Sequence, residues 1–600
     1  MHVTYSKYRK AILITAKRLT KSKRMSFESL ANELLLDLFE YFPVVDLLRA
    51  FHRLNTRIDN LIISHFQTHT LDFQNISKQD FDIICQVNLS VIIKHVVSLR
   101  LSDDNETPQQ IELFRSYQWN FNQFESLRYL TLNQIRSLPM TTEILSRCLQ
   151  LIHLNLTALY SQHQDDDFLR FMNSIWNLPK LIRCYLNVKL THESNIPTPT
   201  VYSMSIEHLS LIDVSYHTGQ LLHLYEHTPN LRYLEISLYH MNYVEKLRRT
   251  IPSVTTLYLA SLNPQDGILK SVLQYMPNLY RLKVEIVYLP VNGYQWEQII
   301  ESYLPKLKIF QLKMTFQMID IRFKEDLFTS FQTSFWLEKH QWFIRYHDNS
   351  NQICLYTLPY SFSELTIYSP VQTKYTCPND IFYQSYNCVQ RLLSLSCSLR
   401  AIMHLPYLQF PNIITLTIKF PYNEYLIPFV KEFRRLHTLE ISRRHNTLDA
   451  DVQSQLQLLL DHATDLYSLK FDSWPEIKQS TTSEKLTPMI IKSHSIRQLN
   501  LLGFCHCFTH EECIDFSRSS IAIHCEILCI RVEQRKSILY LINTIDTLRA
   551  LVVRSVDDSW TCFQKDENEL DRWLKQNLSS ECSIQRDSRS MRLIRIWIHR

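Results

Sequence analysis

The amino-acid sequence predicts an α/β solenoid that follows a short all-α module. A leucine triplet, L-x-x-L-x-L, recurs along most of the 600-residue chain at intervals of about 25 residues. A helical pattern of apolar residues precedes most triplets, as in "GQLLHLYEH" and "QWEQIIESYL". A proline commonly separates the two, because proline cannot continue a helix. Such units bury their apolar faces only by stacking, so they predict a curved array.

Each triplet is interpreted as a short strand whose alternate residues are buried. The spacing is that of leucine-rich repeats. Two longer intervals, from Leu154 to Leu209 and from Phe310 to Leu365, each predict a degenerate repeat or an insertion. The triplets are Leu127/Leu130/Leu132, Leu151/Leu154/Leu156, Ile206/Leu209/Leu211, Leu231/Leu234/Ile236, Val254/Leu257/Leu259, Leu279/Leu282/Val284, Leu307/Phe310/Leu312, Phe362/Leu365/Ile367, Ile413/Leu416/Ile418, Leu436/Leu439/Ile441, Leu466/Leu469/Phe471, Ile496/Leu499/Leu501 and Leu548/Leu551/Val553.

The repeats depart from the consensus at the turn after the strand. The consensus places an asparagine or cysteine three residues beyond the last leucine, where this chain has residues such as Ile135 and Leu262. Packed turns and an irregular curvature are therefore expected. The repeated string P-N-L, as in "TPNLRYLEI" and "MPNLYRLKV", is interpreted as punctuation between helix and strand. A β-hairpin is expected near residues 341–358, where "QWFIRYH" and "QICLYTL" flank "DNSN".

Residues 25–68 form the predicted helical module. Their central stretch, "FESLANELLLDLFEYFPVVDLLRAFHRLNTRIDNL", indicates two or three short amphipathic helices broken at Pro43. The stretch resembles the F-box, whose pattern opens Leu-Pro-x-Glu-Leu-Leu and continues with Ile-Phe-x-Tyr-Leu and Asp-Leu. The matching positions are Leu30, Glu33, Leu34, Leu35, Leu38, Phe39, Tyr41, Phe42, Asp46 and Leu47.

This resemblance implies that the module docks a Skp-type adaptor of a cullin–RING ubiquitin ligase while the repeats hold a protein substrate. The chain is then expected to be a substrate-recognition subunit in ubiquitin-dependent degradation, with no catalytic residue of its own. Ala31 stands where the family has proline, and Ile58 where it has tryptophan, and both departures are expected to weaken adaptor binding. The alternative is a leucine-rich-repeat scaffold unconnected to ubiquitination. The expected adaptor-binding residues are Leu30, Glu33, Leu34, Leu35, Leu38, Phe39 and Leu47.

The residues between the buried leucines of each strand are expected to line the concave face of the array. Their mixture of charged and aromatic side chains favours a peptide or a folded protein over a ligand made of phosphates. Tyrosine and arginine are common at the energetic centres of protein interfaces. The predicted substrate-binding residues are Tyr129, His153, His208, Tyr233, Tyr258, Arg281 and Lys283.

The composition argues against several function classes. With only 4 glycines, the chain cannot build a glycine-rich phosphate loop, and it lacks the G-x-S-x-G and H-E-x-x-H motifs. No enzyme activity, cofactor or metal is therefore expected. The net charge of +5 is small for this length and predicts no nucleic-acid partner, and the absence of a long apolar run predicts no membrane span. The 14 scattered cysteines indicate a reducing compartment, the cytoplasm or the nucleus.

Three further segments complete the predicted organisation. Residues 1–24 are basic and are expected to be a disordered leader, and Met25 offers a second translation start. Residues 69–566 are assigned to the repeats and residues 567–600 to a helix and strand that cap them. Within the repeats, "CHCFTHEEC" (505–513) gathers cysteines and histidines, but its C-x-C spacing is too tight for a zinc knuckle. A repeat turn with buried thiols is the preferred interpretation.

Overall fold

The computed structural model describes residues 27–600 with internal gaps. The gaps are residues 118, 161–164, 191–196, 214–215, 217, 239–249, 262–267, 289, 318–320, 350–351, 368–371, 395–407, 423–434, 444–448, 475–486, 559–568, 588–589 and 591. The predicted leader and Met25 therefore lie outside the described residues.

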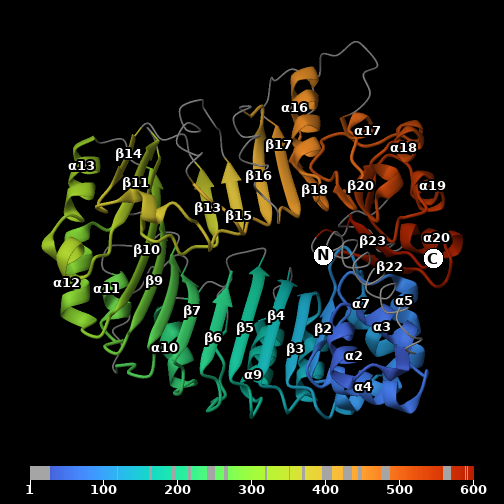
Figure 1. Ribbon diagram of the computed structural model, residues 1–600, viewed down its shortest axis with the longest axis horizontal. Helices are drawn as coiled ribbons and strands as arrows, with labels where there is room; N and C mark the ends of the chain where they lie inside the picture. Colours follow the sequence, from blue (N-terminus) through green and yellow to red (C-terminus); the bar gives the residue numbers. More distant parts are fainter. Residues whose placement is uncertain are drawn as a thin grey trace.

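The chain forms a mixed α/β solenoid with two sheets built mainly from parallel strands, which confirms the predicted solenoid (Figure 1). Ten consecutive strands of the first sheet pair in parallel in chain order. They are β1 (Thr70–Asp72), β2 (Ser98–Ser102), β3 (Tyr129–Ile135), β4 (His153–Tyr160), β5 (Arg183–Leu190), β6 (His208–Ile212), β7 (Tyr233–Leu238), β8 (Thr256–Ser261), β9 (Arg281–Val287) and β10 (Ile309–Gln317).

The hairpin expected near residues 341–358 corresponds to β11 (Ile344–Asn349) and β12 (Gln352–Thr357). It is not a separate insertion, because β12 pairs antiparallel with β10 and so extends the first sheet, which then ends at β14 (Gln372–Tyr375). The parallel run therefore stops there and resumes in a second sheet. The second sheet consists of β13 (Glu364–Ile367), β15 (Arg391–Ser394), β16 (Thr415–Phe420), β17 (Thr438–Arg443), β18 (Ser468–Ser473), β19 (Gln498–Asn500), β20 (Ile527–Val532), β21 (Ala550–Ser555), β23 (Ile594–Trp597) and β22 (Ser583–Arg586).

Helices lie on the outer side of the strands (Figure 1). No described helix combines the length and apolarity that crossing a bilayer requires. The outer helices and helical turns are α5 (Lys78–Ile83), η2 (Ile84–Asn88), α6 (Leu89–Ile92), η3 (Ile93–His95), α7 (Gln110–Ser116), η4 (Phe121–Gln123), α8 (Leu138–Ser146), α9 (Asp165–Trp176), α10 (Thr218–Glu226), α11 (Ile268–Leu273), α12 (Gly293–Tyr303), α13 (Ile321–Ser330), η5 (Phe335–Lys339), η6 (Asp380–Tyr383), α16 (Asp449–His462), α17 (Thr487–Ile490), α18 (His510–Ser517), η8 (Ala522–His524), α19 (Lys536–Thr544) and α20 (Glu569–Asn577).

The triplet leucines form buried rows because neighbouring strands pair in register. Leu130, Leu154 and Leu209 are fully buried, and Leu130 pairs directly with Leu154. The degenerate repeat expected between Leu154 and Leu209 is β5, in which the buried Cys184 takes the place of the central leucine. Cys525 likewise stands at the first triplet position before β20. A cysteine is small and apolar enough to fill these positions, so both repeats escape a search for leucine.

The P-N-L asparagines do more than punctuate the chain. Asn230 Nδ2 donates a hydrogen bond of 2.7 Å to the backbone oxygen of Met204 in the preceding repeat. Asn278 Nδ2 donates in the same way to the backbone oxygen of Pro252 at 2.9 Å, and Asn412 Nδ2, in the related string P-N-I, donates to that of Asn387 at 2.8 Å. Each of these bonds gives a hydrogen-bond donor to a carbonyl in a turn, which strand pairing does not provide. The asparagine link between repeats therefore lies before the strand, not after it as in the consensus.

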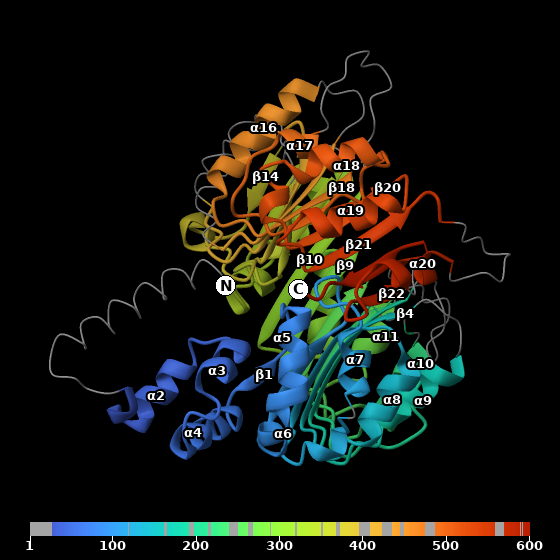
Figure 2. The same ribbon diagram turned by 90° about the vertical axis from the view of Figure 1, so that its right-hand side faces the viewer.

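The N-terminal helical module consists of η1 (Phe27–Ser29), α2 (Asn32–Phe39), α3 (Val44–Phe51) and α4 (Thr56–Phe66). Its helices lie to one side of the sheets (Figure 2). The module joins the solenoid where α4 contacts α6 and η3, and where α3 contacts η2. Its buried side chains are continuous with the core of the first repeats.

The two ends of the solenoid contact each other, so the molecule is a ring. Figure 1 places the C-terminal strands β22 and β23 beside α5 and α7, and Figure 2 also shows β22 near α5 and α7. The fully buried Arg595 of β23 reaches Asp103 after β2, with Nη1 3.1 Å from Oδ1 and Nη2 2.7 Å from the backbone oxygen. The rings of Trp597 and Phe81 pack at 5.3 Å. Side chains close the ring, and among the described strands no pairing joins the two sheets.

A second ion pair at the junction contains a carboxylate with a perturbed pKa. Arg549 Nη2 lies 3.3 Å from Glu106 Oε2, and Arg549 Nη1 donates to the backbone oxygen of Ile76 at 3.3 Å. Burial raises the pKa of Glu106 to about 7, and nearby Asp104 adds to the rise while Arg549 opposes it. Closing the ring therefore costs free energy when Glu106 is ionised.

Replacing Arg595 with Met should weaken the junction, because buried Asp103 would keep only its longer contact with Arg136, at 3.7 Å. We expect a loss of about 3 kcal/mol in the free energy of unfolding. Urea denaturation measures the loss, and hydrogen exchange should be faster in β2 and β23. The control is Arg100→Met, which removes a more exposed pair with Asp72 and should cost at most about 1 kcal/mol. Equal losses in both variants would refute a buried ionic junction.

The raised pKa of Glu106 predicts a pH-dependent junction. Protonation favours the folded state, so this contribution is complete below the ordinary pKa of 4.5 and is lost as the pH rises through about 7. Glu106→Gln should therefore stabilise the protein at about pH 8 by on the order of 2 kcal/mol and change little at about pH 5. Thermal melts at both pH values test this, with the exposed Glu112→Gln as the control. The same effect at both pH values would contradict the prediction.

Candidate functional site

The N-terminal helical module divides its apolar residues between a core and a surface. Leu35, Phe39 and Leu47 are completely buried. This corrects part of the expected adaptor-binding set, because these three side chains form the core and cannot touch a partner in this conformation. The helix α2 carries leucines on several sides, so its pattern alone did not distinguish core from surface.

The surface of the module is rich in exposed apolar side chains. Leu34 is 56% exposed, Leu54 56% and Tyr41 52%. Glu33 is also exposed, and Leu30 and Leu38 are half-buried. Leu54 and Tyr41 were not among the expected adaptor-binding residues. A small module that leaves several large apolar side chains in water is typical of a surface that binds another protein.

The two positions that depart from the F-box pattern have different structural consequences. Ala31 is exposed and precedes α2 with φ −62° and ψ 151°, a conformation that proline adopts without strain. Ile58 is buried in the module and is 1% exposed. The change at position 58 therefore alters the packing of the core. The change at position 31 leaves the backbone with the dihedral angles that a proline would have.

The second candidate surface is the concave face of the first sheet. The first residue of each strand from β3 to β9 pairs with the first residue of the next strand. These residues form a single row across the sheet, here called the concave row. Its members are Tyr129, His153, Arg183, His208, Tyr233, Thr256 and Arg281.

Five of the seven predicted substrate-binding residues belong to the concave row, and Tyr258 and Lys283 lie two positions further along their strands. Thr256 and Arg183 are the two members outside the predicted set, and Arg183 was missed together with its whole repeat. It begins β5, whose triplet is Leu181/Cys184/Leu186, and the cysteine concealed that repeat. A search that accepts cysteine at triplet positions would have found it.

Ring contacts link the members of the concave row. The rings of Tyr129 and His153 lie 6.1 Å apart, and those of His208 and Tyr233 stack at 5.8 Å. Burial lowers the pKa of both histidines, and the charge of Arg183 between them lowers it further. The row is therefore cationic at one point and aromatic on both sides of it.

Next to the concave row lies a polar cluster in which most charged groups interact with groups of opposite charge or with aromatic rings. Lys283 Nζ lies 4.3 Å from the centre of the Tyr258 ring and 4.8 Å from that of Phe362. Burial lowers the pKa of Lys283, while Glu235 and Glu285 oppose this change. Burial and the carboxylate of Glu235 raise the pKa of Tyr233 to about 12. Such a cluster can hold a ligand by hydrogen bonds and aromatic contacts.

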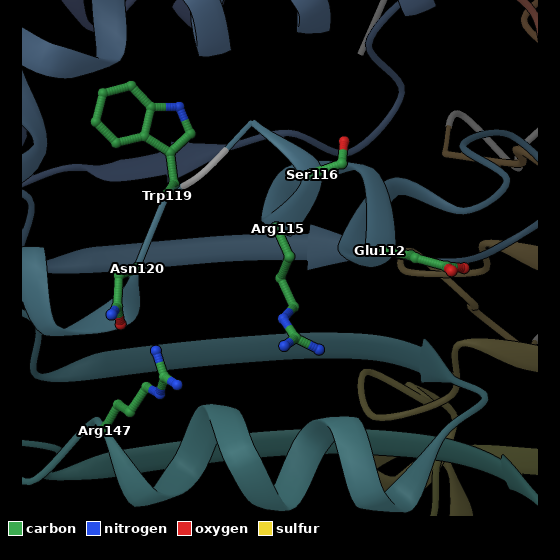
Figure 3. A pocket seen from close by; sticks show the side chains of 6 residues that line it. All are labelled: Glu112, Arg115, Ser116, Trp119, Asn120 and Arg147. Carbon is green, nitrogen blue, oxygen red and sulfur yellow. The ribbon is translucent and has the colours of Figure 1, made fainter.

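Two surface hollows lie elsewhere. One, of about 450 Å³, lies between α7 and the end of α8 and is lined by Glu112, Arg115, Ser116, Trp119, Asn120 and Arg147 (Figure 3). Both arginines already contact Glu143, at 2.6 and 2.9 Å, so little positive charge remains for a ligand. The other, of about 490 Å³, lies at the ring junction, where Lys78 pairs with Asp82 and His599 with Glu581. Its charges are also paired.

The cysteine- and histidine-containing stretch at 505–513 leads into the N-terminus of helix α18. Thr509 caps α18 and forms a reciprocal capping box with Glu512, whose carboxylate also lies 2.8 Å from His506 Nε2. Cys513 is buried as expected, but Cys505 is exposed. Within the described parts of the chain, no three His, Cys, Asp or Glu side chains are grouped to hold a metal ion.

Comparisons with known proteins give little further information. No protein-family model matches the chain, and no curated protein matches it. Among solved structures, the chain is similar to the crystal structure of a TLR13–ssRNA13 complex, with 14% sequence identity over 77% of this chain and 82% of that chain. The TM-score of this match is 0.23.

Placing the proline of the F-box pattern at position 31 should stabilise the helical module. Because Ala31 already has a proline-like φ, Ala31→Pro should add about 0.4–1 kcal/mol by restricting the unfolded chain. Thermal unfolding measures this gain. The control is Ala50→Pro in the interior of α3, which should destabilise the protein by about 3 kcal/mol. A destabilising effect of Ala31→Pro would show that the segment before α2 has a different conformation.

Proposed function

We propose that this chain is the substrate-recognition subunit of a Skp–cullin–F-box-type E3 ubiquitin ligase. In this proposal the helical module binds the adaptor, and the concave face of the repeats binds a protein substrate. The chain itself carries out no chemistry. It raises the rate of ubiquitin transfer by holding the substrate close to a charged enzyme.

One observation supports the proposal most strongly: the helical module leaves Leu34, Leu54 and Tyr41 more than half exposed. A cap whose sole purpose was to close the solenoid would bury these side chains against the first repeat. The module instead buries a separate set, which includes Leu35 and Phe39, and presents the rest to solvent. The F-box resemblance of residues 27–61 gives this surface its expected partner, a Skp-type adaptor.

The alternative function is a leucine-rich-repeat scaffold that has no connection to ubiquitination. It is favoured by Ile58, which fills the module core at the position where the family has tryptophan. It is also favoured by the burial of Phe39 and Leu47, which reduces the surface left for an adaptor. Both functions place a protein ligand on the concave face, so the adaptor distinguishes them.

The adaptor interaction is tested with the double variant Leu34→Asp/Leu54→Asp. Both side chains are exposed, so the variant should fold, and circular dichroism checks this. Capture of a purified Skp-type adaptor should fall at least about tenfold, since each side chain is expected at the centre of the interface. The matched control is Val556→Asp, which changes an equally exposed apolar residue (61%) at the far end of the chain. Absence of adaptor binding by the natural chain would reject the ligase function in favour of the scaffold.

A further inference from the structure

The centre of the concave row is a cationic patch formed by His153, Arg183 and His208 on three adjacent strands. Neighbouring parallel strands are separated by about 4.8 Å, so the patch spans about 10 Å. Arg183 is exposed, and the two histidines are half-buried. Three side chains that carry or can acquire a positive charge thus lie in one line.

The patch differs from Lys313 and Arg391 on the inner face in forming no ion pair among the described residues. Lys313 lies 2.6 Å from Glu285, Arg391 lies 2.9 Å from Glu440, and these pairs satisfy their charges internally. Among the residues that the structure describes, no side chain accepts a hydrogen bond from Arg183 and no carboxylate pairs with it. The imidazoles of His153 and His208 also have no hydrogen-bond partner there.

Aromatic side chains flank the patch on the same row. Tyr129 is 45% exposed and contacts His153, while Tyr233 stacks against His208. Arg281 lies beyond Tyr233 and likewise lacks an ion pair among the described residues. The row therefore presents apolar faces on both sides of a cationic centre and a second cation further along.

We propose that the concave row binds an acidic segment of a protein substrate, with carboxylates at His153, Arg183 and His208 and apolar or aromatic side chains on Tyr129 and Tyr233. This inference rests on the proposed use of the concave face for substrate. A carboxylate between two imidazoles and a guanidinium replaces the missing anionic partner. It also favours the protonated histidines, so the site is stronger when they are charged.

Charge complementarity favours an acidic peptide over a nucleic acid. The cationic centre is short, and the inner face carries carboxylates close to it. Glu235 lies one row further along, where Ser210 Oγ donates to it at 2.6 Å, and Glu207 lies next to His208. A continuous phosphate backbone would place charge against both glutamates. A peptide can place its two or three carboxylates at the patch alone.

The test is fluorescence anisotropy with a labelled synthetic peptide in which glutamates alternate with tyrosine and leucine. We expect the natural full-length chain to bind it, and the same peptide with glutamine in place of glutamate to bind at least about tenfold more weakly. Arg183→Glu should reduce binding about tenfold or more, and binding should weaken with added salt. The matched control is Arg170→Glu on the outer helix α9, which makes the same change in charge and should leave binding unchanged.

The histidines predict a pH dependence of peptide binding, which would not arise if their role were only structural. Binding should tighten as the pH falls from about 8 to about 5.5, and the double variant His153→Gln/His208→Gln should lose this dependence. The charged groups facing these histidines are Arg183, Glu207 and Arg232.

Three results would overturn the inference: no binding of the acidic peptide, equal binding of the glutamine peptide, or tighter binding of a single-stranded oligonucleotide. The adaptor assay is independent of these results. Arg183→Glu should capture the adaptor like the natural chain, so failure of the peptide assay and failure of the ligase proposal are separate outcomes.

Discussion

The in-register pairing of parallel strands is the constraint on which the rest of the molecule depends. It buries the leucine rows, because Leu130, Leu154 and Cys184 fall opposite one another on adjacent strands. The same register aligns the residues between the leucines, since side chains alternate along a strand. Residues that are far apart in the chain, such as His153 and His208, thereby occupy one row. Core and candidate binding surface are two consequences of a single alignment.

At its ends and in its middle, the array is held together by contacts other than the parallel strand pairing of the repeats. At the middle, the antiparallel strands β11 and β12 stop the parallel run and separate the two sheets. At the C-terminus, β23 pairs antiparallel with β21 and so covers its edge. The junction of the two ends relies on buried charges, chiefly Arg595 with Asp103, instead of strand pairing. A buried ion pair is stable only when the two charged groups lie in a defined position. This junction therefore restricts the geometry of ring closure more than a hydrophobic contact would.

The sequence predicted the regular part of this fold well and its irregular part poorly. Leucine spacing identifies most strands, but those it passes over include β5 and β20, where cysteine replaces leucine, and β15, where Ser394 stands at the last triplet position. Five members of the concave row were predicted because they follow from register alone. Arg183 was missed with its repeat. Local patterns also could not show that Asp103 meets a residue 492 positions away, nor which leucines of α2 face inward.

Ring closure has a consequence for how such a chain can change over time. An open solenoid can gain or lose a unit at little cost, because each repeat contacts only its neighbours. In this ring, an added or deleted repeat would displace β23 from β2 by a whole unit and separate Arg595 from Asp103. The number of repeats is therefore coupled to the integrity of the junction. Changes in the loops and in the residues of the inner rows can accommodate a new ligand without altering the circumference.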